Sequence, residues 1–136
     1  MILSILIIFA FLLVCSSYQI FPTKKFISIT PAGIYGSYTL GIASYIQNNY
    51  NLNEYSYIGA SSGSWNSLIC CYKFDKNTFI KKLLEQPFFG KSSVNKLQEN
   101  LFEYFMKNYN SEDFDLKKLY ISVSELKNFG LKSRII

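Results

Sequence analysis

The sequence contains no histidine, and its 136 residues include one arginine and three cysteines. Without histidine, the chain cannot supply a Ser-His-Asp triad, a Cys-His pair or a histidine-ligated zinc site. Cys15 lies in an apolar leader, while Cys70 and Cys71 are adjacent and cannot easily bridge one another within a helix, so no disulfide framework is predicted. We expect no metal and no other cofactor.

Basic residues are in excess but are not clustered. Lysine and arginine outnumber aspartate and glutamate by 14 to 9, and no basic run is longer than two. Nucleic-acid binders cluster their basic residues and favour arginine, so no nucleic-acid partner is expected. A mild attraction to anionic lipid surfaces fits the charge, since each nearby basic residue contributes on the order of 1 kcal/mol there. Hydrophobic content of 49% is enough to fill a core and excludes a disordered chain.

The first segment, MILSILIIFAFLLV, is apolar and uncharged. Its length is typical of the core of a signal peptide, with the small residues Cys15 and Ser17 placed for cleavage after Ser17. Counted through Phe21, it reaches about the 20 residues that span a bilayer, and the following lysine pair would then stay cytoplasmic. We therefore expect an apolar helix that is a signal peptide or membrane anchor at 1–17, followed at 25–136 by the N-terminal part of one domain, membrane-associated or in the secretory pathway. A buried core helix is the alternative for the leader.

Strand-like and helical patterns alternate along the rest of the chain. Strands are expected at 26–30, 55–60, 119–126 and 131–136, and helices at 35–50, 65–72, 76–86 and 93–109. The helix at 35–50 is predicted from an apolar stripe at Tyr35, Tyr38, Ile42, Tyr45 and Ile46. Strand followed by helix, twice over, indicates an α/β fold with a parallel sheet.

The segment Gly59-Ala60-Ser61-Ser62-Gly63 is a G-x-S-x-G motif where a strand gives way to a helix. A nucleophile in this position sits on a tight, strained turn, so the glycines Gly59 and Gly63 have a steric cause. Ser61 is the candidate nucleophile. The amide of Ser62 would lie at a helix N-terminus, where the dipole favours a developing oxyanion. The same pentapeptide also occurs in turns that have no catalytic role.

The first strand-to-helix turn, PAGIYG at 31–36, keeps the last two glycines of a G-x-G-x-x-G arrangement, which aims amides at an anion. A dinucleotide-binding fold would also need an acidic residue at the end of the second strand. That strand instead ends at Gly59-Ala60-Ser61. An oxyanion loop after one strand and a serine after the next fit acyl transfer better than hydride transfer.

The segments ISITPAGIYGSYTLGIASYI and YIGASSGSWNSL resemble the patatin-like phospholipase family. The resemblance implies a three-layer α/β/α fold with a mainly parallel sheet, and a Ser-Asp dyad that works without histidine on lipid acyl groups at a membrane surface. By position, Ser61 matches the family's nucleophile, and Ala32, Gly33 and Ile34 match its oxyanion loop. Gly36 matches the closing glycine of that loop.

The chain departs from the family pattern at three places. Pro31 replaces the first loop glycine and removes an N–H, and Tyr35 stands where many members have arginine or lysine. No aspartate is followed by glycine, so the dyad's Asp-Gly-Gly or Asp-Gly-Ala segment is missing and we expect a partial gene product. Asp75, Asp113 and Asp115 fall at helix starts or in loops, where N-capping explains them better.

Three hypotheses for the function are compatible with the sequence. The first is a serine lipid acyl hydrolase with Ser61 as nucleophile, lacking its aspartate. The second is a catalytically silent, membrane-associated lipid-binding pseudoenzyme that uses the same pocket. The third is an α/β domain whose glycine turns are purely structural.

Overall fold

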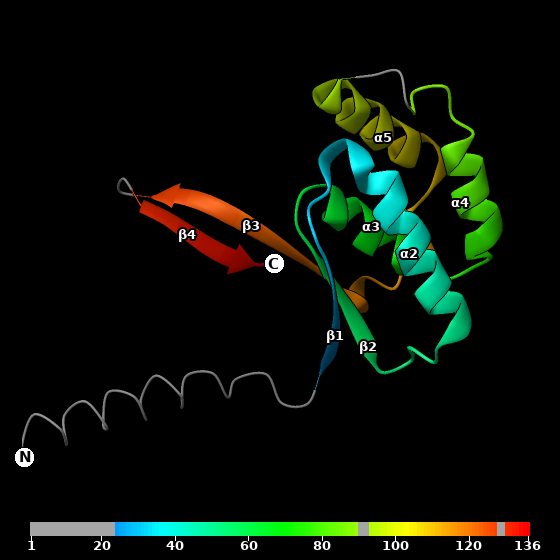
Figure 1. Ribbon diagram of the computed structural model, residues 1–136, viewed down its shortest axis with the longest axis horizontal. Coiled ribbons are helices and arrows are strands. Elements are labelled where there is room, and N and C mark those ends of the chain that lie inside the picture. Colours follow the sequence, from blue (N-terminus) through cyan, green and yellow to red (C-terminus); the bar gives the residue numbers. More distant parts are fainter. Residues whose placement is uncertain (1–23, 90–92, 128–129) are drawn as a thin grey trace, which may run out of the picture.

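The structure, a computed structural model, describes residues 24–89, 93–127 and 130–136 (Figure 1). The apolar leader, and our expectation that it is a helix, lie outside these residues. Four strands are described: β1 (Lys25–Ile29), β2 (Tyr55–Gly59), β3 (Leu119–Lys127) and β4 (Gly130–Ile135). The helices described are α2 (Gly36–Asn49), α3 (Ser62–Cys70), α4 (Lys76–Leu84) and α5 (Val94–Asn108), with short 3₁₀ turns at Gly33–Tyr35, Ser111–Asp113 and Leu116–Lys118. No helix in these ranges is both long and apolar enough to cross a bilayer.

The strands form one sheet in the order β1-β2-β3-β4. The first three run parallel, with Ile27 opposite Tyr57, and β4 returns antiparallel beside β3. Right-handed crossovers between successive neighbours leave the connecting helices on one face of a sheet. Figure 1 agrees, since α2, α3, α4 and α5 all lie on one side of β1 and β2. The predicted α/β class with a mainly parallel sheet is confirmed, and the described part has two layers.

Aromatic rings from α4, α5 and the loop after α5 form a cluster in the core. Phe79 of α4 packs against Phe105 of α5, with ring centroids 5.9 Å apart, and both contact Phe114. The loop after α5 is held to the end of α3 by an isolated bridge between Tyr72 and Phe114. Burying several aromatic side chains together supplies much of the stability of a domain this small.

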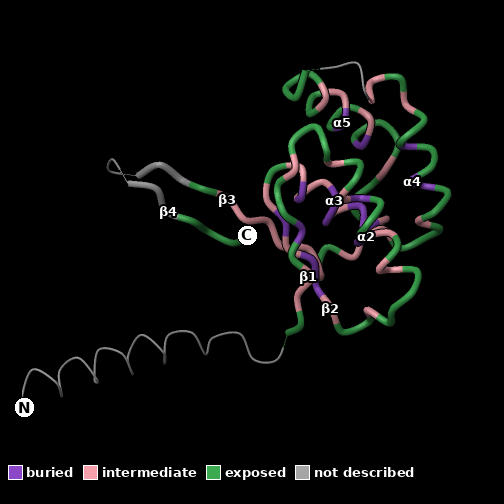
Figure 2. Tube along the Cα trace, viewed as in Figure 1, coloured by how far each residue is buried: buried purple, intermediate pink, exposed green. Residues whose placement is uncertain are grey.

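The apolar stripe that predicts α2 faces outward. Its members Tyr35, Tyr38, Ile42 and Tyr45 are 46–72% exposed, and Figure 2 shows long exposed stretches along this helix. The helix buries Leu40 and Ala43 instead. These smaller side chains let α2 pack closely on α3, which leaves the larger rings on the outside. α2 also carries no charged residue, which is unusual for the exposed face of a surface helix.

The expected N-cap is present at Asp75, whereas Asp113 is the third residue of a capping box whose N-cap is Asn110. The Asp75 carboxylate accepts hydrogen bonds from the amides of Asn77 and Thr78, at 3.1 and 3.2 Å, and so starts α4. The Asp113 side chain accepts a hydrogen bond from the Asn110 amide, at 2.8 Å, within a capping box. Asp115 stands at the start of a 3₁₀ turn, but its side chain makes no capping bond there.

Candidate functional site

Ser61 sits on a sharp turn between β2 and α3. Its φ of 54° and ψ of −127° make it the single non-glycine residue with positive φ in the described part of the chain. Such a conformation costs of order 1–3 kcal/mol and persists only where the surrounding structure imposes it. The turn is closed by hydrogen bonds from the Gly63 amide to the Ala60 carbonyl and from the Ser64 amide to the Ser61 carbonyl, both 2.9 Å. This is the geometry in which a serine hydroxyl is presented at the end of a sheet.

Both motif glycines are required by close backbone approach, as predicted. A Cβ on Gly59 would overlap the carbonyl of Gly63 and would lie 2.6 Å from the Ser67 hydroxyl. A Cβ on Gly63 would overlap the carbonyl of Ile29, at the end of β1. Since the opposing atoms are backbone, no rotamer change can relieve the overlap. The sheet and α3 are therefore in contact through glycine directly around Ser61.

The loop after β1 lies against the start of α3. The Ala32 amide donates a hydrogen bond to the Ser62 hydroxyl at 2.8 Å. A Cβ on Gly36 would come within 3.2 Å of the Ser62 Cβ, so the loop and α3 approach each other closely at this glycine too. The parallel pairing of β1 with β2 brings these two loops together at the C-terminal ends of the strands, where open α/β sheets place their ligand sites.

Three backbone amides, those of Gly33, Ile34 and Ser62, are the candidate donors for an anionic oxygen. Tyr35 donates the first internal hydrogen bond of the turn, 2.9 Å to the Ala32 carbonyl, so the amides of Gly33 and Ile34 precede it. Gly33 has a φ of +53°, which glycine adopts without penalty. Ser62 is the first residue of α3, and amides in a first helical turn have no acceptor within the helix. The Ala32 amide already donates its hydrogen bond to the Ser62 hydroxyl, so it is not a donor for an anion at this site.

Asn66 is a site-supporting residue that the sequence analysis missed. It is buried on α3, and its side-chain amide donates to the Gly36 carbonyl at 2.9 Å and to the Thr39 hydroxyl at 2.7 Å. These bonds fix the start of α2, and with it the loop, against α3. The signal that could have revealed it is a polar residue between two positions of the apolar stripe of α3. The hydroxyl of Ser62 was missed in the same way, since the motif suggested a role for its amide alone.

A small, mostly apolar cavity opens beside Ser61. Its volume is about 90 Å³, and α5 forms one wall through Leu97 and Leu101. An adjoining cavity of about 50 Å³ lies beside the loop and is lined by Gly33 and Ile34. The two share Ser62, Trp65, Leu97 and Leu101. Trp65 also packs against Phe105, with centroids 5.4 Å apart, so it serves the core and the cavity wall together.

The described residues provide no proton acceptor for Ser61. None of the residues that line its cavity is acidic, and within the described ranges its hydroxyl makes no hydrogen bond. Asp75 caps α4, Asp113 accepts a hydrogen bond within its capping box, and Asp115 lines a different cavity at the other end of β2. Nor do the described residues gather three potential ligands around a metal position. The arrangement presents a serine hydroxyl beside an apolar cavity, and no acidic residue is among the residues that line that cavity.

Comparison with known proteins finds no family model, no curated protein and no solved structure that matches this chain.

Proposed function

We propose that this chain provides the nucleophile half of a serine lipid acyl hydrolase of the patatin-like type, with Ser61 as the nucleophile. One observation carries the proposal, namely the strained conformation of Ser61 between two glycines that cannot be replaced without backbone overlap. Proteins keep strain of this kind where it serves a site. A purely structural turn of the same sequence has no need to hold a non-glycine residue at positive φ.

The chemistry follows from the neighbours of Ser61. An ester carbonyl seated over the serine would direct its oxygen to the amides of Gly33, Ile34 and Ser62, which stabilise the negative charge that develops on attack. The acyl chain would enter the apolar cavity against Trp65 and Leu97. In a Ser-Asp dyad, a carboxylate accepts the serine proton. That carboxylate must come from outside the residues that line this cavity.

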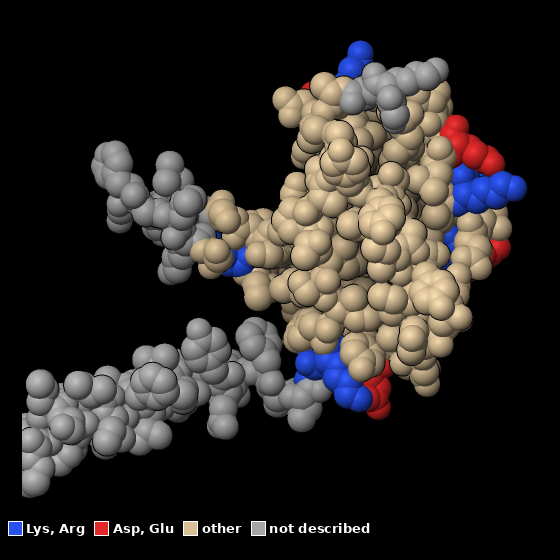
Figure 3. All heavy atoms as spheres, viewed as in Figure 1, with Lys and Arg blue, Asp and Glu red and all other residues tan. Residues whose placement is uncertain are grey.

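The exposed face of α2 supports a lipid surface as the partner. Ile34, the exposed residue directly before the stripe, lines the cavity beside the loop, and the stripe runs on along the helix through Tyr38 and Tyr45. In the view of Figure 3, uncharged atoms cover this side of the molecule and charged side chains lie mainly at its edges. Tyrosine suits the boundary between hydrocarbon and water because its ring is apolar and its hydroxyl is polar.

Removing tyrosines from this stripe should weaken attachment to lipid. In the 18–136 form, which lacks the apolar leader, we expect the double variant Tyr38→Ser/Tyr45→Ser to bind phosphatidylcholine vesicles roughly 10-fold less well, because two large rings no longer leave water. Vesicle flotation measures the bound fraction. Phe74→Ser is the matched control, since Phe74 is equally exposed but lies outside the stripe. Equal losses for the control and the double variant would remove the stripe from the lipid-binding surface.

A catalytically silent lipid-binding protein is the second candidate, favoured by the lack of an acidic group beside Ser61. The two candidates differ in whether any product of the gene contains the missing aspartate. Reading the nucleotide sequence past the codon for Ile136 tests this directly. An in-frame Asp-Gly-Gly or Asp-Gly-Ala run supports the hydrolase, and its absence from every transcript supports the silent protein.

A further inference from the structure

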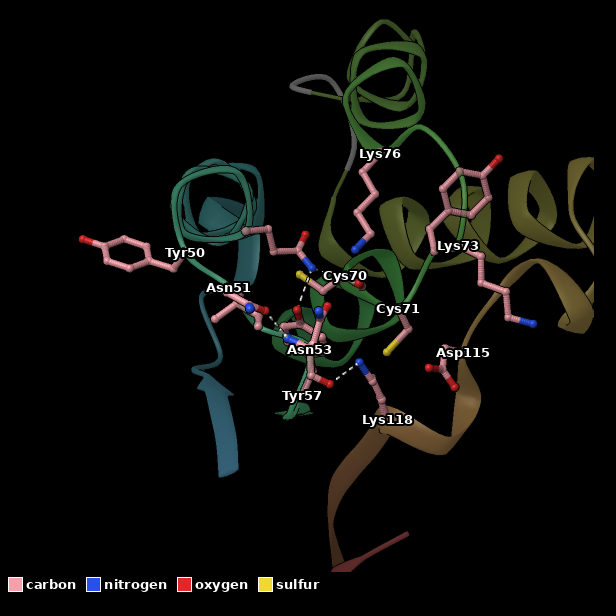
Figure 4. A pocket seen from close by; sticks show the side chains of 13 residues that line it. Tyr50, Asn51, Asn53, Tyr57, Cys70, Cys71, Lys73, Lys76, Asp115 and Lys118 are labelled. Atoms are coloured by element: carbon pink, nitrogen blue, oxygen red, sulfur yellow. Dashed lines mark hydrogen bonds between the residues drawn. The ribbon is translucent and has the colours of Figure 1, made fainter. Parts of the chain in front are cut away.

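A second cavity lies at the opposite end of β2 from Ser61. Its volume is about 320 Å³, within the usual range for small-molecule sites. The walls come from the ends of α2 and α3, the start of α4, the loop before β2 and the turn before β3 (Figure 4). The segment Asn51 to Asn53 precedes β2 here, whereas Ser61 follows β2, so the two sites do not share a residue.

Lysines dominate the charge of this cavity. Lys73, Lys76 and Lys118 line it, and Asp115 is its single acidic residue. Figure 4 shows the Lys76 and Lys118 side chains reaching into the space from different walls, while Lys73 points away. Lys73 donates a hydrogen bond to the Glu112 carbonyl at 2.7 Å, which agrees with that direction. Two ammonium groups therefore face the cavity.

These two ammonium groups are not neutralised by their surroundings. Lys118 donates a hydrogen bond to the Asn53 carbonyl at 2.8 Å. This bond fixes the position of the ammonium group, but a neutral carbonyl does not neutralise its charge. Lys76 makes no hydrogen bond and no ion pair with any other described residue. Asp115 likewise forms no ion pair within the described ranges. With a single carboxylate among its lining residues, the cavity keeps an excess of positive charge, which favours an anion there.

The floor of the cavity is polar and fixed. The Gln47 side-chain amide donates to the Tyr57 hydroxyl at 2.7 Å and to the Cys70 carbonyl at 2.9 Å. Because the Tyr57 oxygen accepts this bond, its own hydrogen is free to point into the cavity. Burial raises the pKa of the Cys70 and Cys71 thiols to about 12, so both remain neutral at physiological pH and add no negative charge.

We propose that this cavity binds a small oxyanion of the phosphate class, held between the ammonium groups of Lys76 and Lys118 above the hydroxyl of Tyr57. Lysine binds phosphate as a point charge, and charge-assisted hydrogen bonds are about twice as strong as neutral ones. The volume accommodates inorganic phosphate or a phosphate monoester with a small substituent. The site is independent of the chemistry proposed for Ser61.

Isothermal titration calorimetry of the full chain with inorganic phosphate, in 150 mM NaCl, tests this site. Lys76→Gln and Lys118→Gln should each weaken the affinity roughly 10-fold or more, through loss of one charge-assisted contact. Tyr57→Phe keeps the ring and should weaken it less. The matched control is Lys81→Gln, also on α4 but outside the cavity, for which we expect a change below about twofold.

Two further measurements separate the sources of the anion. Glycerol phosphate competes for the site if a free monoester suffices, whereas Lys76-dependent binding to vesicles containing phosphatidic acid indicates a lipid headgroup. Ser61→Ala should leave the phosphate affinity unchanged, which keeps this test separate from the proposed hydrolase. Circular dichroism of each variant confirms folding. If Lys76→Gln and Lys81→Gln bind phosphate equally, or if the parent chain does not bind it, the site does not exist.

Discussion

Alanine at Gly63 should destabilise the protein by at least about 3 kcal/mol, at the upper end of what overpacking costs. The new methyl group would overlap the Ile29 carbonyl and come within 3.0 Å of the Thr30 carbonyl oxygen. Relief would require β1 and α3 to separate, and the contact between them also holds the loop after β1 beside the start of α3. We expect the same direction for Gly59→Ala, whose methyl group would meet the Gly63 carbonyl. Urea denaturation, followed by the fluorescence of the single tryptophan, measures the change.

Gly41→Ala is the matched control for both substitutions. Gly41 lies within α2, and a Cβ there would meet nothing within 4 Å. Alanine should therefore stabilise the protein by about 0.5–1 kcal/mol, because it has the higher helix propensity. If Gly63→Ala proved as stable as Gly41→Ala, the tight contact between the sheet and α3 would be wrong, and the argument for a strained turn at Ser61 would lose its basis.

The helices and strands could be predicted closely from the sequence because their local signals agree with one another. Asp75 as N-cap and Pro87 just beyond the end bracket α4, and the stripe through Leu97, Leu101 and Phe105 marks α5. The pairing of β1 with β2 also follows from their alternation with helices. Such signals involve residues a few positions apart, and single sequences carry that information well.

The orientation of α2 could not be predicted, because the hydrophobic pattern does not say which face a helix buries. Its largest side chains, such as Tyr38 and Tyr45, form an exposed face, and the helix packs through Leu40 and Ala43. Close packing on α3 selects the smaller residues. A tertiary contact between two helices decides the outcome, and it is not encoded in the periodicity of either helix alone.

For the candidate site too, the local features could be predicted and the long-range contacts could not. The motif places Ser61 and its two glycines on a turn, which is local information. Two hydrogen bonds of the site join residues 30 positions apart. The Ala32 amide donates to the Ser62 hydroxyl, and the Asn66 side-chain amide donates to the Gly36 carbonyl. The cavity at the other end of β2 joins residues further apart, since Lys76 and Lys118 line it together only after α5 has returned the chain to the sheet. No spacing rule connects such residues.

The 136-residue chain should be nearly inert towards a short-chain p-nitrophenyl ester. Without a proton acceptor, Ser61 retains only binding and oxyanion stabilisation, a deficit of several orders of magnitude in turnover. Ser61→Ala should therefore change almost nothing in this chain. In a polypeptide in which the chain continues through an Asp-Gly-Gly or Asp-Gly-Ala segment, hydrolysis should appear, and Ser61→Ala should abolish it.

Initial rates of p-nitrophenol release, compared across these four proteins, measure the prediction. Robust hydrolysis by the 136-residue chain that disappears in Ser61→Ala would contradict catalytic incompleteness. Asp113 or Asp115 would then have to act as the base, which requires a rearrangement of the capping box or of the turn before β3.

The most direct test of Ser61 as the nucleophile is the equilibrium binding of butylboronic acid, because it needs no catalytic base. The serine oxygen adds to boron and its proton passes to solvent, leaving a tetrahedral, negatively charged boronate in the position of the oxyanion. Boron-11 NMR distinguishes this adduct from the trigonal acid. The control is Ser44→Ala, a serine of α2 that lines neither cavity beside Ser61. We expect the tetrahedral signal with the parent chain and with this control, and its loss, with affinity down about 10-fold or more, in Ser61→Ala. An equal tetrahedral signal in Ser61→Ala, or none in the parent chain, would contradict the assignment.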